Sequence, residues 1–169
     1  MKKIVSIALI LILCFGMAGC AKTYHGTDEL LKKAREELPI SEADTTDIQY
    51  AGMCKKENTA LAWFISGNEY QKHYYLPMEI EIKNNGEDYT FVHTYKPVTD
   101  KCPDVATVNW QEGYAFLINN PKVSTVKITL ENGEQIRKIV QKDSVPYSFY
   151  VPSALSEYVF LDADGKEVQ

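Results

Sequence analysis

Two short segments of this chain are apolar at every position, and they constrain its fold more than any other feature. Residues 60–65 read Ala-Leu-Ala-Trp-Phe-Ile, and residues 114–118 read Tyr-Ala-Phe-Leu-Ile. Successive side chains of a β-strand point to opposite faces of the sheet, so a strand without polar positions is covered on both faces. We therefore expect both segments to be central strands. The small face of Ala60 and Ala62 would let a helix approach closely.

One helix is expected before the β region, over residues 27–38. Thr27 can cap its first turn, where the negative charges of Asp28 and Glu29 also interact favourably with the helix dipole. Pro39 ends the helix. An apolar stripe is formed by Leu30, Leu31, Ala34 and Leu38. Glu36 and Glu37 of the same helix argue against a membrane-surface helix, so we expect it to dock on a sheet of the same domain.

The clearest hairpin signal is Asn85-Gly86, which lies between two segments of alternating polarity. A two-residue loop there places six residues on one face in three cross-strand pairs: Ile82 with Tyr89, Ile80 with Phe91, and Met78 with His93. The same register puts Glu79 and Glu81 on the opposite face, which we expect to be polar and solvated.

Two further turns are expected near the C-terminus. At Asn132-Gly133, a three-residue loop over 131–133 pairs Ile128 with Ile136 and gives Gly133 a left-handed conformation. The turn at Asp164-Gly165 folds residues 166–168 back on 158–161. The acidic residues of this turn resemble a calcium loop only briefly, because position 5 of the pattern is a lysine.

The order of these elements predicts an α+β domain that is mainly antiparallel β, with an N-terminal helix packed on a β-sheet or sandwich. The C-terminal half, 124–168, has an immunoglobulin-like or Greek-key-like pattern, without the Cys…Trp…Cys hallmark. The predicted divisions are a signal peptide at 1–19, a tether at 20–26 and a single globular domain at 27–169, β-rich from residue 47 onward.

The N-terminus has the layout of an export signal. Lys2 and Lys3 precede an apolar stretch of 14 residues, 4–17, which would span ~21 Å as a helix and is too short to cross a ~30 Å hydrocarbon core. Residues 17–20, Met-Ala-Gly-Cys, resemble the lipobox of bacterial lipoproteins, with methionine in place of the usual leucine. In its general plan the chain also resembles small lipoproteins of Gram-positive bacteria.

The resemblance implies that Cys20 carries a lipid, such as palmitate, and becomes the first residue of the mature chain. Such a protein would be anchored to the cell membrane on its extracytoplasmic face, because two or more acyl chains give stable attachment. Loss of the signal changes the formal net charge from −5 to −7. An acidic domain repels nucleic acid and anionic headgroups, so the lipid alone would hold it to the membrane.

Two other cysteines remain in the mature chain, Cys54 and Cys102. Outside the cytoplasm they can form a disulfide, which would stabilise the domain by roughly 4 kcal/mol in the chain-entropy model. Two free buried thiols are the alternative. No Cys or His spacing typical of zinc is present, and nothing in the sequence indicates a metal or another cofactor.

No catalytic motif is recognisable, because the sequence has no G-x-S-x-G and no glycine-rich phosphate loop. Exposed tyrosine and tryptophan often mark binding surfaces. The candidate binding aromatics are Trp110, Tyr74, Tyr75 and Tyr95, of which Trp110 precedes a Gln-Glu-Gly turn and is expected to be exposed. Ordinary β-sheet composition also accounts for these aromatics.

These features favour a non-catalytic binding or accessory module at the cell envelope, with an envelope protein or polymer as its partner and no nucleic acid. The alternative is an envelope hydrolase or transferase with a noncanonical site that uses His73, His93 or the glutamates.

Overall fold

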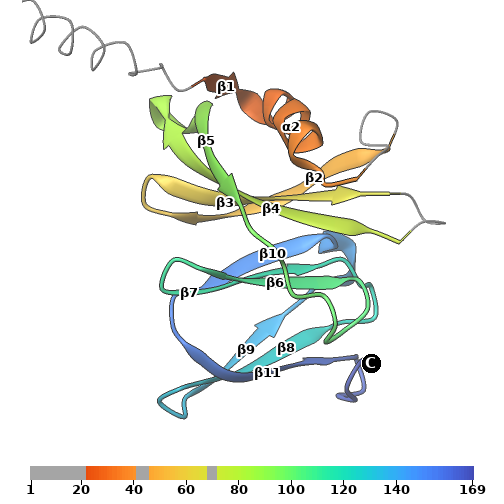
Figure 1. Cartoon of the computed structure of the whole chain (residues 1–169). Helices are drawn as coiled ribbons and strands as arrows, with labels where there is room; N and C mark the ends of the chain where they lie inside the picture. Colours follow the sequence, from red (N-terminus) through yellow and green to blue (C-terminus); the bar gives the residue numbers. More distant parts are fainter. Residues whose placement is uncertain (1–21, 41–45, 68–71) are drawn as a thin grey trace, which may run out of the picture.

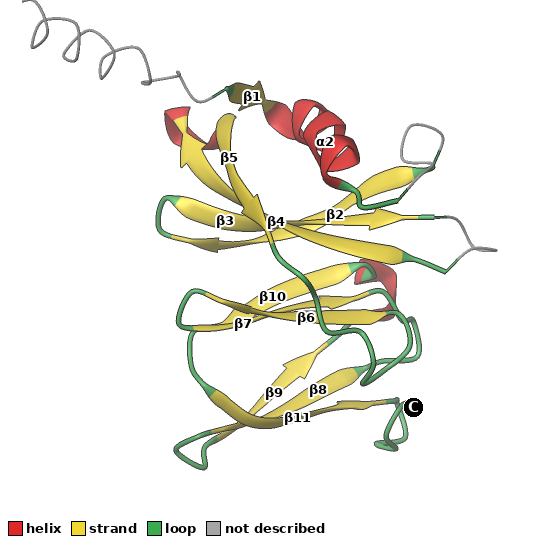
Figure 2. Ribbon diagram, viewed as in Figure 1, coloured by secondary structure: helices red, strands yellow, loops and turns green. Residues whose placement is uncertain are grey.

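The computed structural model describes residues 22–40, 46–67 and 72–169. The predicted signal peptide and Cys20 lie outside the described residues. As the sequence predicts, the described chain is mainly antiparallel β, with one α-helix packed against a sheet (Figure 2). Within these ranges, no helix has the length and hydropathy needed to cross a membrane.

The strands form three sheets stacked in layers, with the helix above them (Figure 1). The upper sheet has the order β1-β5-β4-β3-β2 and contains β1 Thr23–His25, β2 Ile48–Lys56, β3 Thr59–Ser66, β4 Tyr74–Lys83 and β5 Asp88–Thr94. The middle sheet has the order β10-β7-β6 and contains β6 Val105–Trp110, β7 Gly113–Ile118 and β10 Tyr147–Val151. The lower sheet has the order β11-β8-β9 and contains β8 Thr125–Leu130, β9 Gln135–Ile139 and β11 Leu155–Leu161. The helical elements are α2 Gly26–Glu37 and the short 3₁₀ turns η1 Asn84–Gly86 and η2 Lys142–Ser144.

Three apolar cores separate the four layers, and β3 and β7 each contribute to two of them. From β3, Ala60, Ala62 and Phe64 pack in the core under the helix, whereas Leu61, Trp63 and Ile65 pack in the core above the middle sheet. From β7, Ala115 and Leu117 face that second core, whereas Phe116 and Ile118 face the lower sheet. The prediction that both segments are central strands covered on each face is confirmed, and Ala60 and Ala62 share the core under the helix with Leu30 and Ala34.

The hairpin between β4 and β5 has the predicted register near its turn. Ile82 pairs with Tyr89, and Ile80 pairs with Phe91. The predicted pairing of Met78 with His93 is wrong, because a bulge shifts the register between Glu79 and Ile80. Since a bulge places two residues of one strand opposite one of the other, His93 lies opposite Glu79 and Met78 lies opposite Thr94.

Both C-terminal turns are confirmed. Ile128 pairs with Ile136 around a three-residue loop, in which Gly133 has a φ of 85° and its N–H donates to the Leu130 carbonyl over 2.9 Å. After β11, the Val168 N–H donates to the Phe160 carbonyl over 2.9 Å, which returns the chain end along that strand.

The start of the domain differs from the prediction in two respects. Residues 23–25 of the predicted tether form β1, which pairs with β5, so the tether is shorter than expected. The helix begins at Gly26, so Thr27 lies inside it and is not the cap. Instead, Glu29 reaches back and its Oε2 accepts the N–H of the N-cap residue His25 over 2.8 Å.

Candidate functional site

The most unusual polar residue of the fold is Glu79 on β4, whose side chain is only 9% exposed. We expected it to be solvated together with Glu81. That prediction is wrong for Glu79, because its face of β4 packs on the middle sheet at this point. Glu81, two positions along the same face, is exposed and pairs with Lys83 at 2.7 Å.

Glu79 is held by donors from separate parts of the chain. The Tyr95 hydroxyl donates to Oε2, and Gln111 Nε2, from the turn between β6 and β7, donates to Oε1 over 3.0 Å. His93 Nε2 lies 3.8 Å from Oε2, and the His93 ring centroid lies 4.3 Å from that of Tyr95. Burial, reinforced by the bond to Glu79, raises the pKa of the Tyr95 hydroxyl, which keeps it a donor. The cluster therefore fastens the upper sheet to the middle sheet.

A second polar cluster lies at the start of β4. The Tyr75 hydroxyl donates to Asp104 Oδ1 over 3.2 Å, and Asn119 Nδ2 lies 3.2 Å from His73 Nδ1. Burial raises the pKa of the Tyr75 hydroxyl as well. This cluster borders a hollow of about 460 Å³, whose other lining residues are Lys72, Thr99, Asp100 and Pro103. It too joins the upper sheet to the ends of middle-sheet strands.

The two histidines named for a catalytic alternative belong to these separate clusters. His93 is level with Glu79, and His73 precedes Glu79 by six residues of an extended chain, a separation of ~20 Å. The structure therefore does not bring His73 and His93 to one site.

The candidate binding aromatics do not form an exposed surface. Trp110 is fully buried between the upper and middle sheets, its ring centroid 5.0 Å from that of Tyr150, so its predicted exposure is wrong. Tyr75 is also buried, and Tyr95 is half-buried against the same core. Tyr74 is half-buried on the opposite face, in the core under the helix. The β6–β7 turn misled the prediction because its neighbour Trp110 points inward from the last residue of β6.

Cys54 and Cys102 are free and buried in the structure. Of the two alternatives, a disulfide or two free buried thiols, the structure has the free thiols. Cys54 lies in the core between the upper and middle sheets, and Cys102 lies in the core between the middle and lower sheets. Burial raises the pKa of each thiol to about 11, which makes both poor nucleophiles at neutral pH.

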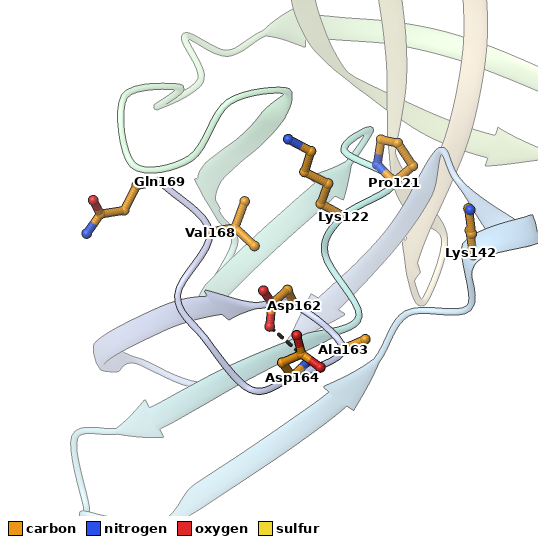
Figure 3. A pocket seen from close by; sticks show the side chains of 8 residues that line it. All are labelled: Pro121, Lys122, Lys142, Asp162, Ala163, Asp164, Val168 and Gln169. Carbon is orange, nitrogen blue, oxygen red and sulfur yellow. Dashed lines mark hydrogen bonds between the residues drawn. The ribbon is translucent and has the colours of Figure 1, made fainter.

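The acidic turn near the C-terminus is a hairpin, as predicted. Figure 3 shows Asp162 turned toward its own loop, where its Oδ1 accepts the N–H of Asp164 and the N–H of Lys166, each over 2.9 Å. The turn borders a hollow of about 500 Å³ that is also lined by Lys122 and Lys142. Across residues 22–40, 46–67 and 72–169, no cluster of three His, Cys, Asp or Glu side chains has a geometry suited to a metal ion.

One feature of the lower sheet was not singled out from the sequence. Lys127 of β8 and Arg137 of β9 are direct cross-strand partners. The register predicted for the three-residue loop already implied this pairing, so the signal was present in the sequence.

Comparison with known proteins identifies no relative of this chain: no family model, no curated protein and no solved structure matches it.

Replacing Glu79 with alanine is expected to destabilise the domain by about 1–3 kcal/mol, because the Tyr95 hydroxyl and the Gln111 amide would lose their buried acceptor. Urea unfolding measures this loss. Glu81→Ala, on the same face of the same strand but exposed, is the matched control and should change the free energy of unfolding by less than about 0.5 kcal/mol. Equal effects of the two substitutions would contradict the structural role of Glu79.

The pair formed by His25 and Asp88 ties β1 to β5 beside the predicted anchor, with Nδ1 and Oδ1 2.6 Å apart. The hydrogen bond to Asp88, aided by its charge, raises the pKa of His25 above 6.5, and the same bond lowers the pKa of Asp88 below 3.8. The His25 contribution to stability is complete below pH 6.5 and disappears as pH rises through the folded-state value. The Asp88 contribution is complete above pH 3.8 and disappears as pH falls through its folded-state value. The pair therefore contributes fully between pH 3.8 and pH 6.5, and the contribution declines beyond each limit until the folded-state pKa is passed.

An NMR titration of the His25 ring should consequently give a pKa above 6.5, and Asp88→Asn should lower it toward that value. Asp143→Asn, remote from β1 in the sequence and in the sheet order, is the control and should leave the His25 titration unchanged. A His25 pKa that does not respond to Asp88→Asn would show that the pair does not form in solution.

Proposed function

We propose that this protein is a lipid-anchored, non-catalytic binding or accessory module on the extracytoplasmic face of a bacterial cell membrane, with the lipid on Cys20. The observation that carries the proposal is the position of β1. This edge strand of the upper sheet begins three residues after Cys20, whereas the lower sheet forms the opposite end of the stack (Figure 1).

The short connection supports a position of β1 near the membrane. Three residues of extended chain reach ~10 Å, so a lipid on Cys20 would keep the upper sheet and its helix close to the bilayer. The mature chain has a formal net charge of −7 once Lys2 and Lys3 are removed. Such a charge gives no attraction to anionic lipids, which favours attachment through the acyl chains. The lower sheet would then face away from the membrane, toward envelope partners.

The use of the buried polar residues also favours a binding role over catalysis. Glu79 joins two sheets through the hydroxyl of Tyr95 and the amide of Gln111. The hydrogen bond from Tyr75 to Asp104 joins the same two sheets near the start of β4. These groups are engaged in holding layers together, which suits a rigid scaffold that presents a surface.

The Greek-key-like character of the C-terminal half belongs to this proposal too. β11 returns to lie beside β8, as the fourth strand of a Greek key lies beside the first. β10, however, has moved to the facing middle sheet, so the motif is divided between two sheets as in a β-sandwich.

Metabolic labelling with radioactive palmitate in a bacterial host tests the anchor. The wild-type chain should be labelled in the membrane fraction, and Cys20→Ala should lose the label and be released. Cys102→Ala serves as the control, because its thiol is buried inside the fold and should not affect labelling. Continued labelling of Cys20→Ala would refute the proposed anchor.

A further inference from the structure

The outer face of the lower sheet carries two like charges directly opposite each other. Lys127 of β8 pairs with Arg137 of β9, and the neighbour of Lys127 on its other side is Val159 of β11. Like charges in direct cross-strand register repel and destabilise a sheet. A chain with a net charge of −5 has enough acidic residues to compensate such a pair.

Among the described residues, no acidic side chain lies within 4 Å of the Lys127 or Arg137 nitrogens. None of the ion pairs among the described residues includes Lys127 or Arg137. Glu157 of β11 lies on this face diagonal to Lys127, since it pairs with Thr129 while Val159 pairs with Lys127, and it forms no ion pair with either cation. Lys127 and Arg137 therefore lack an ion-pair partner in the described part of the chain, and together with Ile139 we name them the β9 patch.

Ile139 adds an apolar element to the β9 patch. It is 65% exposed, the most exposed of the large hydrophobic side chains in the described ranges. It lies two residues from Arg137 on the same strand and therefore on the same face. Moreover, β9 is the edge of its sheet, so one side of its backbone has no strand partner among the described residues.

Protection of the edge against aggregation does not fully explain this arrangement. A charged residue on an edge strand discourages pairing with other chains, which would account for Arg137 and for Lys138. Lys127, however, lies on the central strand β8, where no edge needs protection. Positions that break a local rule without compensation are typical of functional surfaces.

We propose that the β9 patch binds an extended, acidic segment of a partner protein, which adds a strand beside β9. Its carboxylate would lie opposite Arg137 and offset the repulsion from Lys127, and an apolar side chain two positions away would cover Ile139. This inference rests on the binding role proposed above and specifies its surface and its partner.

The chemistry of the patch favours a protein segment over an anionic polymer. Two cations neutralise few phosphates, whereas strand addition combines backbone hydrogen bonds with side chains at alternate positions. Lys138 and Arg137 would at the same time repel a basic strand, so the charge of the segment decides whether it binds.

The test uses the full-length protein in detergent solution and two synthetic peptides. Both peptides have threonine on one face of the strand and Val-Glu-Val or Val-Lys-Val on the other. The glutamate peptide should bind about tenfold more tightly than the lysine peptide, since attraction replaces repulsion at one position. Arg137→Glu should reverse the preference. Lys166→Glu, the same charge change in the exposed C-terminal hairpin, should leave it unchanged.

A second measurement does not require any peptide. Arg137→Thr should raise the midpoint of thermal unfolding by about 1–3 °C at low salt, because it removes the repulsion from Lys127, and the gain should shrink as salt screens the charges. If Arg137→Glu does not fold, Lys127→Glu replaces it in the binding experiment.

Equal binding of the two peptides, or no binding of either, would overturn the proposal. So would binding of long-chain polyphosphate that is lost in Arg137→Glu while the peptides fail, which would assign the patch to an anionic polymer. None of these outcomes touches the labelling of Cys20, and loss of that labelling would not alter peptide binding in detergent. The two proposals can therefore fail separately.

Discussion

Gly113→Ala is expected to destabilise the domain by about 3 kcal/mol. Gly113 begins β7 and pairs with Trp110 across the tight turn from β6. A Cβ atom there would lie 2.0 Å from the carbonyl oxygen of Val151 and 3.0 Å from the Cα of Pro152. These are backbone atoms of the β10 region, so the clash can be relieved only by separating strands of the middle sheet. Urea unfolding monitored by circular dichroism measures the loss.

Gly133→Ala is the control for this substitution. Gly133 has a φ of 85°, and a Cβ atom added there would meet open space, with nothing beyond its chain neighbours within 4 Å. Only backbone strain therefore opposes the alanine, at about 1 kcal/mol. If Gly113→Ala were no more harmful than Gly133→Ala, the close approach of β10 to β7 would be wrong.

Phe116→Ala is expected to reduce the free energy of unfolding by about 3–5 kcal/mol. Its ring is fully buried and stacks on Phe149, with centroids 4.7 Å apart and planes 5° from parallel. It also meets the edge of Tyr158 of the lower sheet at 5.2 Å. One side chain thus joins the middle and lower sheets, and its loss leaves a cavity between them.

Val92→Ala provides a comparison on an exposed apolar residue. Val92 is 43% exposed on β5, and its truncation should change stability by less than about 0.5 kcal/mol. A loss for Phe116→Ala as small as that for Val92→Ala would mean that the lower sheet does not pack on the middle sheet in solution.

Much of the layered fold could be predicted because it depends on local pattern. The apolar residues 60–65 and 114–118 required cover on both faces, and they form β3 and β7, each between two cores. The Gly133 loop was predictable because only one register sorted Ile128 and Ile136 together, and that register is observed.

The errors concern contacts between distant parts of the chain. Alternation placed Glu79 on the face opposite Ile80 correctly, but it carries no information about what covers that face, which is the middle sheet. The β4–β5 bulge was also missed. Its extra residue lies in β5, so the alternation of polar and apolar residues along β4 is unchanged and gives no sign of it. β1 has only three residues, too few for a recognisable period, and it forms by pairing with β5.

The candidate site was the least predictable part. Turn chemistry suggested an exposed Trp110, yet the tertiary core buries it completely. Conversely, the opposed charges of Lys127 and Arg137 follow directly from the predicted register. They become informative only because neither side chain forms an ion pair in the described structure.

The proposed membrane-held arrangement is tested most directly by measuring the distance of each end of the stack from a bilayer. Cys54 and Cys102 are buried, so Thr23→Cys and Glu157→Cys can each be labelled selectively with a fluorophore on the lipidated full-length chain in vesicles. A quencher attached to lipid headgroups should strongly quench the fluorophore at position 23 of β1 and only weakly quench that at position 157 of β11. Equal quenching at the two positions, or stronger quenching at 157, would contradict an anchor at Cys20 that turns the lower sheet away from the membrane.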